Sequence, residues 1–443
     1  MQLNNKTIGA SLAAAACSLL NQAQAADAVQ ANGNQNWTVD SALMYYAEDQ
    51  GRIKDASARA LITHTIDEDR SFTIGATVDT LTGASPSGAV KTDRAQTFTS
   101  PSGRGGYTTP ANQTPLDSTF KDTRFAGTLS YTLPVFDASR LQVGGDASSE
   151  HDYLHLGGNL RLESDFNQKN TTLFGGVAYS YDTITPEGGI PVAFSALSNQ
   201  RSNGEGEDDS HTSRGISNDT KTIVDGLLGV SQILSRRALL DVALSYSQVN
   251  GYMTDPYKFL SVVDGATGRL VNNPSNTSFG YYLYEKRPDK RAKESVYAEL
   301  RYALDRDSFA VNYRFMTDDW GINSHTVEAR YHWNINKTHW FEPQVRYYTQ
   351  TAADFYNTVL IDGQTLPQYA SADYRLAKLN TWTLGAKYAW QTRSGNEYSV
   401  RAEYYSQTPT ESANSRIGIL NNYSEIVPSM SAVLVQFGVK FGF

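Results

Sequence analysis

Cysteine and long apolar runs are scarce in this chain of 443 residues. Its single cysteine, Cys17, lies in the first 25 residues, so the rest of the chain has no thiol to form a disulfide or to bind a metal. Beyond those residues no apolar run approaches the roughly 18 residues of a membrane-spanning helix, and the mean hydropathy is −0.45. These absences exclude a disulfide scaffold, a thiolate metal site and a helical inner-membrane protein.

Positive charge is also in short supply. The chain has 38 Lys and Arg against 46 Asp and Glu, a formal net charge of −8, which gives nucleic-acid binding no support. Aromatic residues, in contrast, are abundant for so polar a chain, with 27 Tyr, 17 Phe and 6 Trp. Aromatic girdles combined with a polar lumen and polar loops are typical of outer-membrane barrels, and nothing in the composition indicates a cofactor.

The amino terminus has the pattern of a secretory signal peptide. Lys6 precedes a short apolar stretch from Ile8 to Leu20, and Ala23-Gln24-Ala25 forms a small-x-small cleavage pattern. We expect cleavage between Ala25 and Ala26, which leaves residues 26–443 as one barrel domain. Acylation of Cys17 is the less favoured alternative, because Ala14 stands where a large aliphatic residue is expected.

The last eleven residues, 433–443, alternate strictly between two faces. Val433, Val435, Phe437, Val439, Phe441 and Phe443 form an apolar face opposite Gln436 and Lys440. This length and period predict a strand that crosses a bilayer. The tail resembles the terminal signal that outer-membrane barrels present to their insertion machinery, carried here by Gln436, Gly438, Phe441 and Phe443.

Alternation of period two recurs along the chain in segments of about ten residues. We therefore predict an all-β fold: a transmembrane, antiparallel, up-and-down β-barrel of about 16 strands, or 14 if one hairpin is lost. Short connections are expected at 67–70, 134–140, 166–170, 233–237, 304–308, 335–339 and 391–396. Long ones are expected near 84–120, 183–220, 250–292, 353–374 and 408–430, with brief turns near Asp49, His151 and Asp319. Short turns face the periplasm and long loops face outward in such barrels.

The same alternation predicts which side chains point into the lumen. Charges must point inward, because a charge facing the acyl chains costs about 2–4 kcal/mol at the bilayer midplane. Near the short turns we expect a belt of mixed charge, with Arg330 opposite Glu342, and elsewhere a wall of mostly small residues. The belt either rigidifies the wall as an ion-pair network that docks a loop, or orients polar solutes in a transverse field. Its members are Glu299, Arg301, Arg314, Glu328, Arg330, Glu342, Arg346, Arg401 and Glu403.

A Gly- and Pro-containing element follows the third strand: Leu81-Thr82-Gly83-Ala84-Ser85-Pro86. With the tyrosine-rich first strand around Met44-Tyr45-Tyr46, the segment 150–153 and the segment 165–171, it resembles an uncharacterised Gram-negative outer-membrane family. This is the domain-of-unknown-function family numbered thirty-five seventy. The resemblance covers nearly the whole chain. It implies an outer-membrane barrel and brings no substrate or catalytic residue.

Two clusters invite a chemical interpretation. Glu150-His151-Asp152 has the residue types of a hydrolase site, but neighbours in a tight turn point apart, so a solvated rim is favoured. A lipase would need a Ser beside a lipid-facing His, and His64 is the only histidine that we place toward lipid. An acidic loop could hold a hard cation but lacks the spacing of an EF-hand, so we predict a solvated loop and no metal site. That loop contains Glu205, Glu207, Asp208, Asp209 and His211.

Three functions remain open. The leading hypothesis is a porin-like channel for small hydrophilic solutes in the outer membrane of a Gram-negative bacterium, gated by an inserted outer loop. The alternative is a closed barrel that serves as a scaffold or export partner for periplasmic proteins. A barrel enzyme comes third. The sequence does not specify the oligomeric state.

Overall fold

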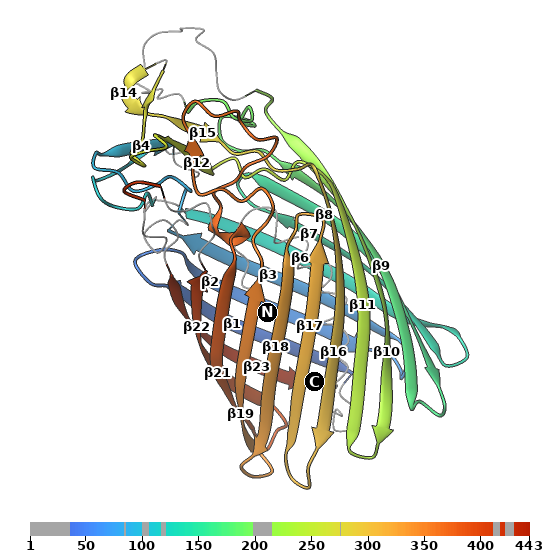
Figure 1. The fold of residues 1–443 in the computed structure, drawn as a ribbon. Coiled ribbons are helices and arrows are strands. Elements are labelled where there is room, and N and C mark those ends of the chain that lie inside the picture. Colours follow the sequence, from blue (N-terminus) through green and yellow to red (C-terminus); the bar gives the residue numbers. More distant parts are fainter. Residues whose placement is uncertain are drawn as a thin grey trace.

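Sixteen antiparallel strands close into one barrel in the computed structural model (Figure 1). The structure describes residues 36–83, 86–99, 106–116, 121–197, 215–274, 276–410, 417–420 and 429–443. Each barrel strand pairs with the next one along the wall, as an up-and-down barrel requires. The strands are β1 (Trp37–Glu48), β2 (Lys54–Thr65), β3 (Ser71–Thr82), β6 (Lys121–Phe136), β7 (Ser139–Ser149), β8 (Tyr153–Phe166), β9 (Thr171–Ile184), β10 (Asp219–Ser235), β11 (Ala238–Gly251), β16 (Lys290–Ala303), β17 (Ser308–Asp318), β18 (Asn323–Asn334), β19 (His339–Gln350), β21 (Leu379–Gln391), β22 (Glu397–Pro409) and β23 (Met430–Gly442).

The barrel closes where β23 pairs with β1. The register runs from Thr38 opposite Gly442 to Glu48 opposite Ala432, and Trp37 exchanges backbone hydrogen bonds with Phe443 at 3.0 and 3.2 Å. Because paired strands leave no edge exposed, closure satisfies the backbone groups that a bilayer could not. The predicted number of strands is confirmed.

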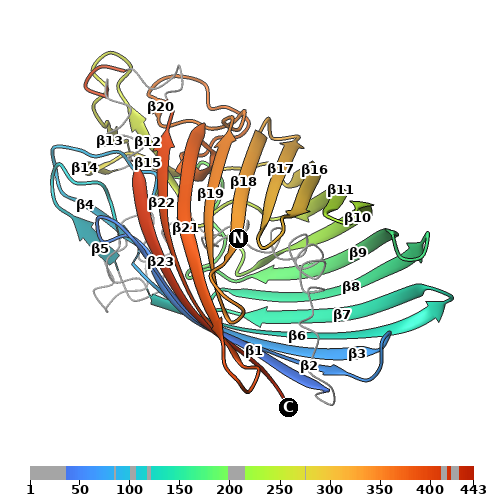
Figure 2. The ribbon, with the colours of Figure 1, turned by 90° about the horizontal axis from the view of Figure 1, so that it is seen from below.

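Short turns and long connections lie at opposite ends of the barrel, as the sequence predicted. Seven short turns gather at what we call the turn end, at the bottom of Figure 1, which faces the viewer in Figure 2. The long connections and three brief turns lie at the loop end. No helix among the described residues is both long and apolar enough to span a bilayer.

Side chains alternate across the wall in the predicted way. In β23, Val435 is 49% exposed on the outer face, whereas its neighbour Leu434 is 5% exposed on the inner face. One prediction was wrong, because His64 is not the only outward histidine. The register pairs His325 with the outward Phe315, and His339 hydrogen-bonds the outward Tyr388 at 2.7 Å.

The long connections fold into a second layer over the loop end. We call this layer the cap; its described residues are 86–99, 106–116, 185–197, 252–274, 276–289, 351–378 and 417–420. It holds three small sheets, of which the largest has the order β15-β12-β20. Its elements are β4 (Gln96–Thr99), β5 (Gly106–Thr109), β12 (Phe259–Val263), β13 (Asn272–Asn273), β14 (Asn276–Gly280), β15 (Tyr282–Tyr284), β20 (Leu360–Ile361) and the 3-10 helix η1 (Tyr374–Leu376).

The cap has an apolar core of its own. Phe98, 1% exposed, stacks on Phe259 at 5.5 Å between ring centroids and meets Tyr282 edge-on at 5.2 Å. The sequence predicted polar loops, and apolar residues spread over five separate connections gave no local periodicity that would reveal this core.

Candidate functional site: the inner wall and the closed mouth

Glu299 is the centre of the inner wall on the carboxy-terminal half of the barrel. It lies on β16 and is 1% exposed. Arg301 donates to it at 2.6 Å, Arg330 of β18 at 2.8 Å and the Tyr297 hydroxyl at 2.9 Å. A carboxylate with three such donors is fully compensated despite its burial.

Ion pairs continue from Glu299 across the neighbouring strands. One predicted contact was wrong: the register places Arg330 opposite Gln344, and Glu342 lies beside His332 at 3.4 Å. The turn pairs Asn334 with Trp340, which shifts β19 by two residues from the predicted alignment. The other pairs are Arg330–Glu328 at 3.3 Å, Arg301–Asp241 at 3.5 Å, Lys387–Glu397 at 3.4 Å and Arg401–Glu403 at 3.2 Å.

All nine residues of the predicted belt lie on inward positions of β16, β17, β18, β19 and β22. Two of them differ from the rest. Arg314 and Arg346 make no ion pair with any described residue within 4.0 Å. The belt therefore contains compensated pairs and two uncompensated cations.

The opposite wall carries a charged network that sequence reasoning missed. His155 of β8 bridges Asp146 of β7 and Asp182 of β9, with nitrogen–oxygen distances of 2.6 Å to each. Asp182 also accepts from the Tyr153 hydroxyl and lies 3.5 Å from the buried ammonium of Lys221. This wall was predicted to be mostly small residues. The alternation rule, applied to β8 and β9, would have placed His155 and Asp182 on the inner face.

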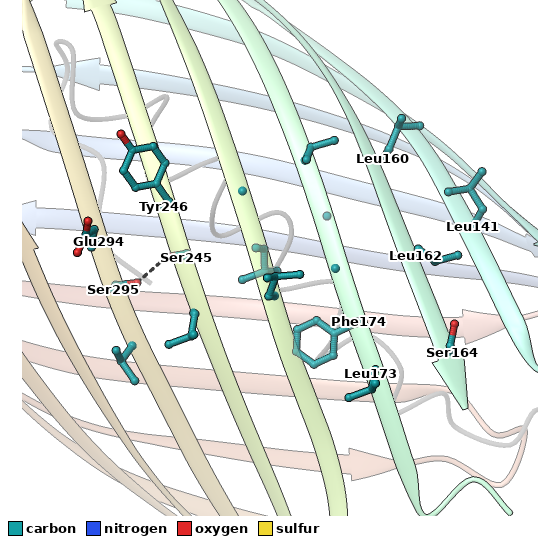
Figure 3. Close-up of a pocket in the computed structure, with 18 of the residues that line it drawn as sticks. Leu141, Leu160, Leu162, Ser164, Leu173, Phe174, Ser245, Tyr246, Glu294 and Ser295 are labelled. Atoms are coloured by element: carbon teal, nitrogen blue, oxygen red, sulfur yellow. Dashed lines mark hydrogen bonds between the residues drawn. The ribbon is translucent and has the colours of Figure 1, made fainter. Parts of the chain in front are cut away.

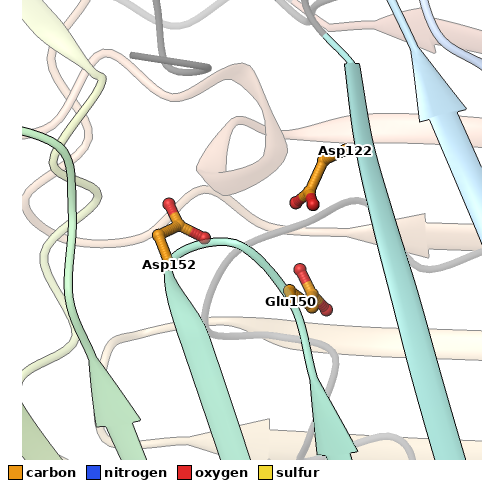
Figure 4. A group of neighbouring side chains, drawn as sticks. All are labelled: Asp122, Glu150 and Asp152. Atoms are coloured by element: carbon orange, nitrogen blue, oxygen red, sulfur yellow. The ribbon is translucent and has the colours of Figure 1, made fainter.

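Three carboxylates converge at the rim of the loop end, where β6 begins and β7 turns into β8 (Figure 4). Asp122, Glu150 and Asp152 have oxygens within 4.8 Å of one another. The expectation that adjacent residues in this turn point apart holds, because His151 pairs with Glu187 at 3.7 Å and does not join the carboxylates, which are two residues apart. Tyr257 of the cap donates to Asp152 at 3.2 Å, so this cluster ties the cap to the rim.

The barrel wall also has an apolar hollow of about 1010 Å³ (Figure 3). Most of its lining residues, such as Leu160, Leu228 and Leu244, occupy outward positions of the strands and are exposed. Polar groups at its margin include Glu294 and Tyr246. The hollow therefore belongs to the surface that faces lipid in a membrane-spanning barrel, not to the lumen.

A buried ion cluster joins separate segments of the cap. Asp373 pairs with Arg287 at 2.9 Å and with Arg375, and Arg375 reaches Asp255 at 3.0 Å. Burial acts to raise the pKa of Asp373, but the positive charges of Arg375, Arg287 and Lys258 outweigh it and hold the pKa below its ordinary value. The loop after β11 and the loop after β19 are thus fastened together by charge.

The residues that follow β3 support this cluster. The Lys258 ammonium donates to the carbonyl of Pro86, and the Phe259 N–H donates to that of Ser87 at 2.8 Å. Gly88 has φ +89°, and a Cβ there would lie 2.6 Å from the Phe259 carbonyl. Ser87 and Gly88 thus pack directly against β12, and residues 84–85 lie outside the described part of the chain.

The segment 373–377 crosses the mouth of the barrel. On one side it belongs to an apolar cluster with Ile223 of β10 and Val249 of β11, both fully buried on the inner face. On the other side Tyr374 lies near Glu48 at the end of β1; burial and this carboxylate raise the pKa of Tyr374. Because β11 is eight strands from β1 in a ring of sixteen, these contacts are with opposite walls.

The remaining predicted residues lie either at the closing strand or outside the described part of the chain. Gln436, Gly438, Phe441 and Phe443 lie on the closing strand or directly after it, and their role in insertion remains a prediction. The cleavage site Ala25–Ala26 lies outside the described residues. So does the acidic loop with Glu205, Glu207, Asp208, Asp209 and His211.

Comparison with known proteins identifies a family. A family model described as "Protein of unknown function (DUF3570)" matches residues 9–441. No curated protein matches the chain.

Three solved structures that match do so at low sequence identity. The siderophore receptor PirA from Acinetobacter baumannii is 9% identical with a TM-score of 0.40, covering 84% of this chain and 53% of that one. CdiB from Acinetobacter baumannii is 9% identical with a TM-score of 0.44, covering 93% and 60%. OccK5 (OpdH) from Pseudomonas aeruginosa is 9% identical with a TM-score of 0.34, covering 93% and 98%. This chain thus spans only 53% and 60% of the length of the first two.

Proposed function

Because this chain belongs to the DUF3570 family of proteins of unknown function, we propose its role from its structure: a gated conduit for small hydrophilic solutes in the outer membrane of a Gram-negative bacterium. Sixteen strands are the observation that carries this proposal. A barrel of eight strands is filled by its own side chains, whereas one of sixteen leaves room for an aqueous channel. The polar, ion-paired inner wall suits water and polar solutes.

The gate is the segment 373–377, which spans the mouth. The Gln350 side chain of β19 donates to the carbonyls of Arg375 and Ala377, at 2.9 Å each, and fixes the base of this segment. Passage through the loop end requires the segment to move away from β10, β11 or β1. Loosening the cap should therefore raise conductance.

The closed mouth also supports a second candidate, a closed barrel that acts as a scaffold or export partner for periplasmic proteins. In that case the segment would be a permanent plug. The belt argues against this candidate, because its carboxylates pair with arginines or a histidine of the wall itself and not with the cap. The two candidates differ in whether the mouth can open.

A reducible tether tests the gate. Lys286 and Ala370 lie on the two loops that the ion cluster joins, and they exchange backbone hydrogen bonds at 2.9 and 3.0 Å. Such antiparallel pairs have Cα atoms about 5.5 Å apart, within the range of a disulfide. In planar bilayers, K286C/A370C should open rarely when oxidised and regain wild-type openings after reduction. The single variants, treated identically, control for the substitutions.

The outcome that rejects the conduit is also clear. R375Q removes the guanidinium that holds Asp373 and Asp255, and should increase the open probability. If neither the wild type nor R375Q conducts, with folding shown by heat-modifiable electrophoretic mobility, the barrel is closed and the scaffold candidate is favoured.

We also propose that residues 1–25 are removed on export. The support is the cleavage pattern at Ala23-Gln24-Ala25. Mass spectrometry of the amino terminus of protein isolated from outer membranes should find Ala26 as the first residue. A first residue of acylated Cys17 would contradict this proposal.

A further inference from the structure

Three arginines on the inner wall have no described partner for their charge. Arg59 of β2 faces inward opposite Ala42 and is exposed, and Arg314 and Arg346 are half-buried. Among the described residues none of the three has a carboxylate oxygen within 4.0 Å. Their charges therefore act on whatever occupies the lumen.

Inward carboxylates are, in contrast, compensated. Glu299, Glu328, Glu342 and Glu403 each pair with an arginine or histidine of the wall. Asp40 makes no ion pair, but the register places it opposite Lys440. Asp225 makes no ion pair within 4.0 Å with a described residue, but it is only 2% exposed, so a solute in the lumen does not meet it. The uncompensated charge that a solute meets is thus positive.

Arg314 and Arg346 are placed to act together. They lie on β17 and β19 with β18 between them, so their strands are about 10 Å apart. The register pairs Arg314 with Thr326 and Arg346 with Glu328, two residues further along β18. The guanidinium of Arg314 lies 5.6 Å from the ring centre of Tyr297, which holds it against the wall.

We infer that the lumen selects small anionic solutes that carry carboxylate or phosphate groups, and that Arg314 and Arg346 form the binding site. The planar guanidinium fork matches either group with two parallel hydrogen bonds. Arg59 lies on β2, seven strands from β17 and five from β19 around the ring, and so adds positive charge from another part of the wall. This inference rests on the conduit proposed above.

Ion selectivity in a planar bilayer tests the inference. The reversal potential under a KCl gradient should show preference for chloride in the wild type, and R314Q/R346Q should lower the permeability ratio at least several-fold. Inorganic phosphate, added to one side, should block chloride current in the wild type and block it several-fold less in the double variant.

Two control variants accompany this experiment. R314K/R346K should keep the chloride preference. R269Q, which removes one such charge from the outer surface of the cap, should leave it unaltered. Each variant is measured alone and in the R375Q background.

The results separate this inference from the conduit itself. Loss of chloride preference and of phosphate block in the glutamine variant, with both kept in the lysine variant, supports the inference. Channels that conduct without preferring chloride, or whose preference and phosphate block survive R314Q/R346Q, overturn it and leave the conduit standing. Absence of conductance in every background overturns the conduit, and the inference with it.

Discussion

Glu299 shows how one buried carboxylate organises a wall. Four donors on three strands converge on it, from Tyr297, Arg301, Asn312 and Arg330. Each of the two arginines also reaches a second carboxylate, Asp241 or Glu328. Removing the Glu299 charge would leave each arginine with one carboxylate fewer and would break the link from β16 to β18. The ion-pair network therefore holds neighbouring strands in one register.

Gly229 lies on the inner wall, where the ring of Phe174 leaves no room for a larger side chain. A Cβ at Gly229 would lie 2.3 Å from Phe174 and 2.8 Å from the Val242 carbonyl, so G229A must displace the ring or the strand. We expect a loss of about 1–3 kcal/mol in the free energy of unfolding, measured by urea titration of the refolded barrel. Gly226, on the same strand, has nothing within 4 Å of its Cβ position, so G226A should change it by less than about 0.5 kcal/mol. Equal effects would contradict the packing argument.

At the scale of elements, the barrel strands could be predicted because each carries its own signal. Period-two alternation lies within about ten residues, and it predicted the short turn at 335–339 and the inward side of Arg330. Which residue of β18 lies opposite which residue of β19 depends on the geometry of the turn between them. Alternation does not specify that geometry, and the predicted pairing of Arg330 with Glu342 was therefore wrong.

The cap could not be predicted in the same way. Its contacts join residues far apart in the chain, such as Val90, whose N–H donates to the Ser261 hydroxyl at 3.0 Å. No window of sequence contains both partners. The crossing of the mouth by segment 373–377 has the same origin, since Arg375 finds Asp255 only when two loops have folded together.

The ion cluster should make the cap sensitive to strong acid but not to mild acid. The folded pKa of Asp373 is below its unfolded value of about 4, so its stabilisation is fully present above pH 4 and is lost as the pH falls through the folded pKa. Hydrogen exchange of amides in 370–377, corrected for intrinsic rates, should show equal protection at pH 7 and pH 5. D373N should lose about 3–5 kcal/mol of protection at both.

The alternative result, unchanged protection in D373N, would show which contacts hold the segment. If D373N is protected like the wild type at pH 7, the apolar contacts of Tyr374 and Leu376 hold the segment, and the ions contribute little. E187Q is a suitable control, because Glu187 forms an exposed pair at 3.7 Å with His151, and such pairs contribute about 0–1 kcal/mol.

At the scale of the whole molecule, a substitution at the carboxy terminus should affect assembly into the membrane without affecting the stability of the folded barrel. The Phe443 side chain is 62% exposed, and its contribution to closure comes from the backbone, which pairs with Trp37 whatever the side chain is. F443A should therefore reduce the amount of folded barrel in outer membranes several-fold, while the refolded protein loses less than about 1 kcal/mol. Quantitative gels of heat-modifiable protein measure the first and urea titration the second.

Phe437 provides the matched control. It is an exposed phenylalanine on the same face of β23, but in mid-strand. If F437A and F443A reduce membrane assembly equally, the tail acts through general hydrophobicity and the predicted signal of Gln436, Gly438, Phe441 and Phe443 is rejected.

The cap also determines what the protein presents to its surroundings. Gly88, Phe259 and Ala372 meet in one place although they come from three different connections, so the surface above them is assembled from distant chain segments. An antibody or a bacteriophage that recognised this surface would bind the assembled protein and fail on the heat-denatured chain. Short peptides from any single loop would not compete for it.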